Sequence, residues 1–198
     1  MGNEGGGRAE ANVGSKAHPT PVGGSYLHFI AQEQHSIQEV YLPRVIKCLQ
    51  QLPEDDIWWR PNPASNSAGN LVLHLAGNIR QWIGSGLGGK PDIRKRDREF
   101  QEAGPMPRRA LMALLQKEVE SACGLLARLS AEDLKKVYLI QGFRVTGLEA
   151  ILHVAEHFAY HSGQIIYLTK LRLAMDLKFT RLPGEHGRKA KRPSLPAI

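Results

Sequence analysis

The chain has 198 residues, of which 42% are apolar, 23% charged and 7% aromatic, and its formal net charge is +7. This length favours one compact domain with terminal extensions. Its two cysteines, Cys48 and Cys123, form no Cys-x-x-Cys pair, which argues against a disulfide framework and a thiolate zinc site. No run approaches the ~18 consecutive apolar residues of a membrane span, and the N-terminus lacks the apolar core of a signal peptide. We therefore expect a cytoplasmic protein with no membrane partner.

Most of the positive charge lies at the C-terminus. Residues 178–198 hold six Lys or Arg against Glu185, a net +5, whereas residues 1–24 are neutral and residues 25–177 carry +2. Residues 1–24 also lack large apolar side chains, so they cannot offset the entropy cost of ordering. We expect a flexible N-terminal segment (1–24), a folded body (25–177) and a basic tail (178–198). The tail allows non-specific nucleic-acid binding, but no recognised reading motif accompanies it, so this partner is the least favoured.

Four stretches show apolar residues at the spacings of three and four that are typical of amphipathic helices. They cover, to within a few residues, 25–49, 67–83, 108–129 and 146–173. Pro43 is expected to bend or split the first, and Thr146-Gly-Leu-Glu149 has the spacing of a capping box that opens the fourth. Four such helices predict an all-α four-helix bundle.

The connections between these helices differ in length. Residues 84–107 are long for a connection in a bundle, and loops of that length are often functional or disordered. Ser130 and Asp133 indicate a short extra turn, and residues 136–144 suggest a brief strand or an extended connection.

Three of the eight histidines, His153, His157 and His161, lie four residues apart on the fourth predicted helix. Each step of four advances only about 40° around the helix axis and ~6 Å along it, so the three form one ridge. Two imidazoles at this spacing can chelate one divalent ion, and a third ligand must come from another element. His74, on the apolar face of the second helix, is the obvious donor. The candidate metal site is therefore His74, His157 and His161.

Each of these histidines also has a simpler interpretation. A lone histidine on an apolar stripe, such as His74, is more often a hydrogen-bonded core residue than a ligand, but a ridge of three is difficult to bury as neutral groups. His153 is the weak member, because a site needs only one adjacent pair from this helix. His153-Val-Ala-Glu-His157 also matches the H-x-x-E-H pattern of inverted zinc peptidases, with Glu156 as general base. Those enzymes need a further acidic ligand in a larger scaffold, and only 41 residues follow His157, so we expect Glu156 to be a solvated carboxylate.

Three segments around these residues carry a family resemblance. They are Asn66–Trp82 (NSAGNLVLHLAGNIRQW), Arg96–Phe100 (RDREF) and His157–Ile165 (HFAYHSGQI). Together they resemble the DinB/YfiT-like superfamily, and within it an uncharacterised DinB-related group of metalloproteins, over roughly residues 25–180.

The resemblance implies an up-down-down-up four-helix bundle, commonly dimeric, with a divalent metal held by three histidines. Those ligands carry over to His74, His157 and His161, and His153 lies outside the triad. Gly69 stands where a bulkier residue is usual, and the basic end after Arg188 has no counterpart. Characterised relatives include transferases and isomerases that use low-molecular-weight thiols, so the expected partners are such a small molecule and a second copy of the chain.

A three-histidine site leaves coordination positions open, as catalytic and ligand-binding metals require. Such a metal lowers the pKa of bound water or thiol. Our first hypothesis is a divalent-metal-dependent enzyme that activates a thiol or water, as a thiol S-transferase, isomerase or hydrolase. The alternative is a non-catalytic metal or small-ligand binding bundle. Zinc or nickel is expected, although iron and copper also suit imidazole ligands.

Three further groups of residues have two interpretations each. Gln164 and Asn78 can orient the ligands or bond to backbone. Three arginines of the long connection can bind an anionic substrate or pair with nearby carboxylates: Arg94, Arg96 and Arg98. Three tryptophans can line a pocket or pack in the core: Trp58, Trp59 and Trp82.

Overall fold

A computed structural model of the chain describes residues 24–104 and 106–179. The predicted flexible segment 1–24 and basic tail 178–198 lie almost entirely outside these residues, so both stay predictions. The described part is mostly helical, as the periodicity predicts. Its elements are α1 (Ser25–His35), η1 (Ser36–Tyr41), α2 (Leu42–Gln51), η2 (Asp55–Ile57), α3 (Ala68–Ile79), η3 (Arg80–Leu87), α4 (Arg96–Gln101), α5 (Arg108–Leu126), α6 (Ala131–Lys135), β1 (Val137–Ile140), β2 (Phe143–Thr146) and α7 (Gly147–Leu173).

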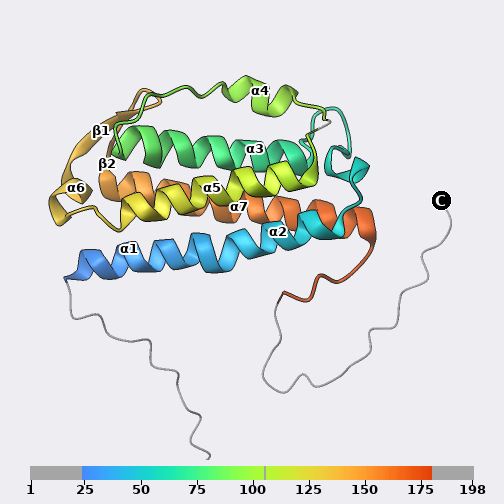
Figure 1. Cartoon of the computed structure of the whole chain (residues 1–198), viewed down its shortest axis with the longest axis horizontal. Coiled ribbons are helices and arrows are strands. Elements are labelled where there is room, and N and C mark those ends of the chain that lie inside the picture. The colour runs from blue at the N-terminus through green and yellow to red at the C-terminus, as the bar shows by residue number, and fades with distance from the viewer. Residues whose placement is uncertain (1–23, 105, 180–198) are drawn as a thin grey trace, which may run out of the picture.

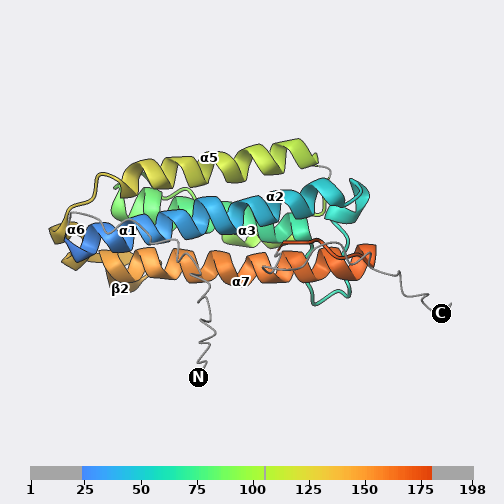
Figure 2. The ribbon, with the colours of Figure 1, turned by 90° about the horizontal axis from the view of Figure 1, so that it is seen from below.

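The helical elements join into four long segments, which lie side by side (Figures 1 and 2). The first is α1, η1 and α2 in succession, and α3 with η3 runs back in the opposite direction (Figure 1). The connection that carries α4 then returns along α3, so that α5 runs in the same direction as α3, and α7 runs opposite to both. Segment α3 contacts both α5 and α7, and α2 also contacts both.

Pro43 changes the first segment without interrupting it. The turn before it, η1, is π-helical, and the chain continues directly into α2 with Pro43 in its first turn. Proline has no N–H to donate to a carbonyl of the preceding turn, and a π-helical turn is one way a helix accommodates a local change in hydrogen bonding. The predicted bend is thus a change of helix type.

The predicted apolar faces form the core. The second predicted helix buries the face that carries His74, which consists of Leu71, His74, Leu75, Asn78 and Trp82. The largest fully buried side chains come from all four segments and include Leu49, Ile79, Leu115, Leu126, Ile151 and Phe158. A histidine in the middle of this core therefore needs polar partners for its ring nitrogens.

A two-stranded hairpin corrects the all-α expectation. Strands β1 and β2 pair antiparallel, from Val137 opposite Thr146 to Ile140 opposite Phe143. Gln141 and Gly142 form the turn with φ of 53° and 84°, because a tight two-residue hairpin turn needs left-handed residues. The predicted connection over residues 84–107 begins with the end of η3, which runs to Leu87, and contains the short helix α4. Among the helices in the described part of the chain, none has the length and hydropathy to span a bilayer.

The place of Gly69 in α3 has a packing reason. A β-carbon built there would lie 2.8 Å from two ring carbons of Trp58, whose indole nitrogen donates to the carbonyl of Met106 at 3.4 Å. The indole ring therefore occupies the space that a side chain at position 69 needs.

We expect Gly69→Ala to lower the free energy of unfolding by about 1–3 kcal/mol, because overpacking outweighs the gain in helix propensity. The matched control is Gly163→Ala in α7, where a β-carbon meets nothing within 4 Å. That control should raise stability by about 0.5–1 kcal/mol. Urea unfolding of both variants measures the difference, and stabilisation by both would contradict the assigned packing.

Candidate metal centre

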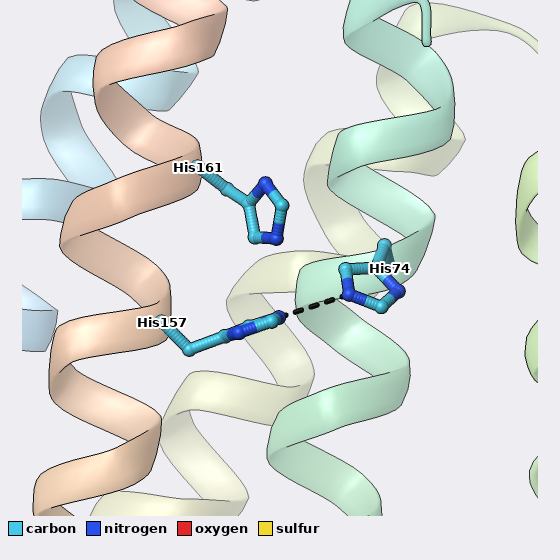
Figure 3. Close-up of side chains that lie close together, drawn as sticks. All are labelled: His74, His157 and His161. Carbon is cyan, nitrogen blue, oxygen red and sulfur yellow. Dashed lines mark hydrogen bonds between the residues drawn. The ribbon is translucent and has the colours of Figure 1, made fainter.

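Helices α3 and α7 bring together the three histidines that the sequence singles out (Figure 3). His74 lies on α3, and His157 and His161 lie one turn apart on α7. One ring nitrogen of each lies within 4.8 Å of the other two, and His157 Nε2 is 2.9 Å from His74 Nε2. The three rings point toward one another across the space between the two helices (Figure 3).

The two helices are fixed at their starts by the same device. Ser67 and Asn70 form a capping box at the N-terminus of α3, and Thr146 and Glu149 form one at α7, as predicted for that pair. Each box satisfies backbone donors that the first turn leaves unpaired. The histidines follow well inside both helices, where the backbone is held by regular hydrogen bonds and neighbouring helices.

Burial keeps the α7 histidines neutral. His161 is 8% exposed and His157 is half-buried, while His74 is 4% exposed. Burial, followed by the neighbouring histidines and Arg94, lowers the pKa of His157 to about 3. Burial also lowers the pKa of His161, although its hydrogen bond to Gln164 opposes this. Near neutral pH both rings thus carry the free lone pair that a metal ligand needs.

Gln164 sets the tautomer of His161. Its side-chain oxygen, which only accepts hydrogen bonds, lies 2.7 Å from His161 Nδ1. The proton therefore sits on Nδ1, and the Nε2 lone pair is left for the cluster. This is the orienting role expected for Gln164. One nitrogen of each of the three imidazoles converges on the same space, and the outer nitrogens of His161 and His74 are held by Gln164 and Glu99, so the donor set fits a divalent ion.

Comparison with known proteins gives the family. A family model described as a protein of unknown function, DUF1572, matches residues 22–185. The chain belongs to the DUF1572 family. A search of curated proteins found no significant match.

Solved structures share the fold of this DUF1572 protein at low identity. A conserved protein from Enterococcus faecalis has a TM-score of 0.63 at 17% identity, covering 73% of this chain and 97% of its own. A DinB-like protein from Bacillus subtilis scores 0.55 at 19% identity, covering 80% and 99%. One from Bacillus cereus scores 0.55 at 18%, covering 74% and 90%. In fold, the predicted resemblance to the DinB/YfiT-like superfamily is confirmed.

His153 lies beside the triad of the DUF1572 protein and has other partners. Its ring stacks on Trp82, with centroids 3.7 Å apart, and its Nε2 lies 3.2 Å from the amide nitrogen of Asn78. The Asn78 amide thus hydrogen-bonds to His153, and none of the side-chain hydrogen bonds among the described residues joins it to His74, His157 or His161. Trp82 is buried against His153, so it packs between η3 and α7.

Glu156 does not join the histidines. Its side chain is exposed on α7, and its charge contributes, after burial, to raising the pKa of Glu33 on α1. The carboxylate thus lies near α1, and the geometry gives no support to a peptidase-like general base at this position.

The arginines of the long connection have separate roles. Arg94 is only 3% exposed and pairs with Glu99, so it is not free to bind a substrate anion. Arg96 is exposed and lies over the ring of Phe100, 4.9 Å from its centroid. Arg98 lines a cavity of about 310 Å³ between α3, α4 and α5, and no histidine is among the residues that line it.

Glu99 is the residue near the triad whose importance the sequence does not reveal. It lies on α4, with Oε2 2.9 Å from His74 Nδ1. In the sequence it is one member of a charged run and suggests only an ion pair with a neighbouring arginine. Glu99 does pair with Arg94, but nothing in the local sequence indicates its contact with His74, 25 residues away. The remaining tryptophans pack as structural groups, Trp58 against Gly69 and Trp59 under Arg172.

Proposed function

We propose that this protein is a divalent-metal-dependent enzyme of the DinB-like type, built as an up-down-down-up four-helix bundle. His74, His157 and His161 would hold the ion. The observation that carries the proposal is the convergence of one nitrogen from each of three imidazoles within 4.8 Å. Three protein ligands leave positions open for a substrate, which is typical of catalytic and not of structural sites. Zinc or nickel is the expected ion, and iron or copper is also compatible with this donor set.

The proposed substrate is a small molecule, with a low-molecular-weight thiol as one reactant. A divalent ion at this site would lower the pKa of a bound thiol or water and so supply thiolate or hydroxide near neutral pH. The side chains would orient and shield the site. His74 and His161 are almost fully buried, whereas half-buried His157 leaves one side accessible. Both cysteines are free and buried, in keeping with the cytoplasmic location expected from the sequence.

Turnover separates the enzyme from the alternative, a non-catalytic binding bundle. Protein loaded with zinc or nickel should consume a thiol in the presence of an electrophile such as 1-chloro-2,4-dinitrobenzene. Metal-free protein and His161→Ala should give only the uncatalysed rate, because both lack the complete site. The assay is run over a panel of cellular thiols. Metal binding without turnover on any of them favours the non-catalytic bundle, and equal turnover by metal-free protein contradicts a metal-centred reaction.

We also propose that two copies associate through the outer side of α7, as the resemblance implies a homodimer. Five large apolar side chains there are 37–67% exposed: Leu148, Leu152, Tyr160, Tyr167 and Leu171. A stripe of this kind on one helix is typical of an interaction surface. It lies on the same helix as two of the three histidines.

A charge in this stripe should separate the copies. We expect the wild type to sediment as a dimer and Tyr167→Glu to sediment as a monomer, because a buried unpaired carboxylate is costly at an interface. Gln116→Glu, which adds the same charge to exposed α5, is the control and should stay dimeric. A monomeric wild type, or a dimeric Tyr167→Glu, would contradict this interface. Analytical ultracentrifugation makes the measurement.

A further inference from the structure

Three side chains from α3 and the α4 connection form a buried chain that ends at the candidate metal centre. Arg94 Nε and Nη2 donate to Glu99 Oε1 and Oε2, each at 2.8 Å. The Glu99 Oε2 atom lies 2.9 Å from His74 Nδ1. The exposed fractions of the three side chains are 3% for Arg94, 11% for Glu99 and 5% for His74. The bidentate ion pair between Arg94 and Glu99 thus contacts the outer ring nitrogen of one predicted ligand, His74.

The contact with Glu99 indicates which nitrogen of His74 carries the proton. Arg94 Nη2 lies 3.0 Å from His74 Nδ1, but it has only two hydrogens, and Glu99 Oε2 and the His74 carbonyl oxygen at 3.4 Å also accept from it. If Nδ1 were unprotonated, its lone pair would face the carboxylate at 2.9 Å and repel it. A proton on Nδ1 turns that contact into a charge-assisted hydrogen bond. Nε2 then keeps its lone pair toward His157 and His161.

The fold of α3 leaves room for this carboxylate. A β-carbon at Gly77 would collide with Glu99 Oε1, so the absence of a side chain there admits the carboxylate between α3 and α4. Asn70, from the capping box of α3, donates through Nδ2 to the carbonyl oxygens of Glu99 and Glu102 at 2.9 and 2.7 Å. The Phe100 ring lies 4.6 Å from the His74 ring, centroid to centroid. Helix α4 is therefore fastened to α3 on both sides of His74.

Stability alone gives a weak reason for this arrangement. The free-energy cost of desolvating two buried charges cancels much of the stabilisation from their attraction. Apolar side chains of similar size often stabilise a protein equally well. Both Glu99 carboxylate oxygens accept from the Arg94 guanidinium at 2.8 Å, and this fixed positive charge favours the ionised carboxylate. An ionised carboxylate on the outer N–H of a ligating histidine fixes the ring orientation and makes the inner nitrogen more basic.

We infer that Glu99 and Arg94 are positioning residues for His74: Glu99 fixes the tautomer and orientation of its ring, and Arg94 holds the Glu99 carboxylate in place. The expected effect of Glu99 and Arg94 on metal affinity rests on the proposed function. The long connection between η3 and α5 thereby has a role, because α4 delivers the carboxylate to the histidine.

The test compares two variants with a matched control. Glu99→Gln removes the charge but keeps the shape, and the double variant Arg94→Met/Glu99→Leu removes both charges, so no unpaired charge is buried. The control is Glu118→Gln, which breaks the ion pair between Arg80 and Glu118 at 2.8 Å without touching a histidine of the triad. Zinc affinity is measured by competition with a chelator. The side-chain nitrogen shifts of His74 are measured by NMR in metal-free protein.

We expect both variants to bind zinc about 10–100-fold more weakly than the wild type, as loss of such outer partners does elsewhere, and Glu118→Gln to be unchanged. In metal-free protein, His74 should change from the Nδ1-protonated form to a mixture of tautomers in the double variant. A folded double variant with wild-type zinc affinity, or with unchanged His74 shifts, would overturn the inference. If the wild type itself binds no zinc, the proposed function fails, while the His74 shifts still test the role of Glu99.

Discussion

Replacing His74 with alanine should abolish metal binding in a chain that still folds. His74 is the single ligand from α3, and its Nε2 lies 2.9 Å from that of His157. Without it, only the adjacent pair on α7 remains, and two imidazoles on an otherwise half-buried helix face hold an ion weakly. Because loss of an outer partner alone costs about 10–100-fold in affinity, loss of the ligand should cost more than about 100-fold.

The matched control for this variant is His153→Ala. His153 lies on the same ridge of α7, with its ring centroid 5.3 Å from that of His157, but it is engaged with Trp82 and Asn78. We expect the His153→Ala variant to bind the same number of metal ions per chain as the wild type. Circular dichroism verifies that both variants are helical, and elemental analysis with chelator competition gives the content and affinity. A His74→Ala variant that binds one ion with wild-type affinity would contradict the three-histidine site. An equal loss of metal affinity in His153→Ala would also contradict it.

Phe158→Ala is expected to cause the largest loss of stability of the variants considered. Phe158 lies on α7 between the two histidines, is 0% exposed, and its ring stacks on Tyr41 at 6.2 Å between centroids. Truncation removes buried apolar surface and leaves a cavity, so the free energy of unfolding should fall by about 3–5 kcal/mol.

Glu156→Ala is the control, because Glu156 is exposed two residues before Phe158 on the same helix and is not among the apolar side chains proposed for the dimer interface. Its cost in stability should stay within about 0.5 kcal/mol. Urea unfolding of metal-free protein compares the two without a contribution from bound ions. Similar losses in both variants would mean that α7 presents a different face to the core than the one described.

The sequence predicts those features whose signal is local or periodic. The spacing of four places His153, His157 and His161 on one ridge, and Thr146 with Glu149 marks the start of α7. His74 is predicted from its place on an apolar stripe. A buried imidazole needs a polar partner for its ring nitrogens, and the ridge of histidines on the fourth helix can supply one. The family resemblance implies the same two α7 histidines, His157 and His161, and each has a ring nitrogen within 4.8 Å of one of His74.

Other features depend on contacts that no local pattern encodes. Helix α4 has six residues and no apolar periodicity, so it is indistinguishable from a charged loop in the sequence. The engagement of Glu99 with His74 and the space left by Gly77 appear only when α3 and α4 are packed together. The π-helical turn η1 arises within a stretch that the periodicity marks simply as helix, and η3 runs from the end of such a stretch into the predicted connection, as far as Leu87.

The most direct measurement is the metal content of wild-type protein purified without a nickel column. The convergence of His74, His157 and His161 predicts about one divalent ion per chain, either as purified or after dialysis against zinc. Elemental analysis gives the ion and its stoichiometry in one experiment. A folded, helical chain that holds no ion after dialysis against zinc, nickel, iron or copper would contradict the account.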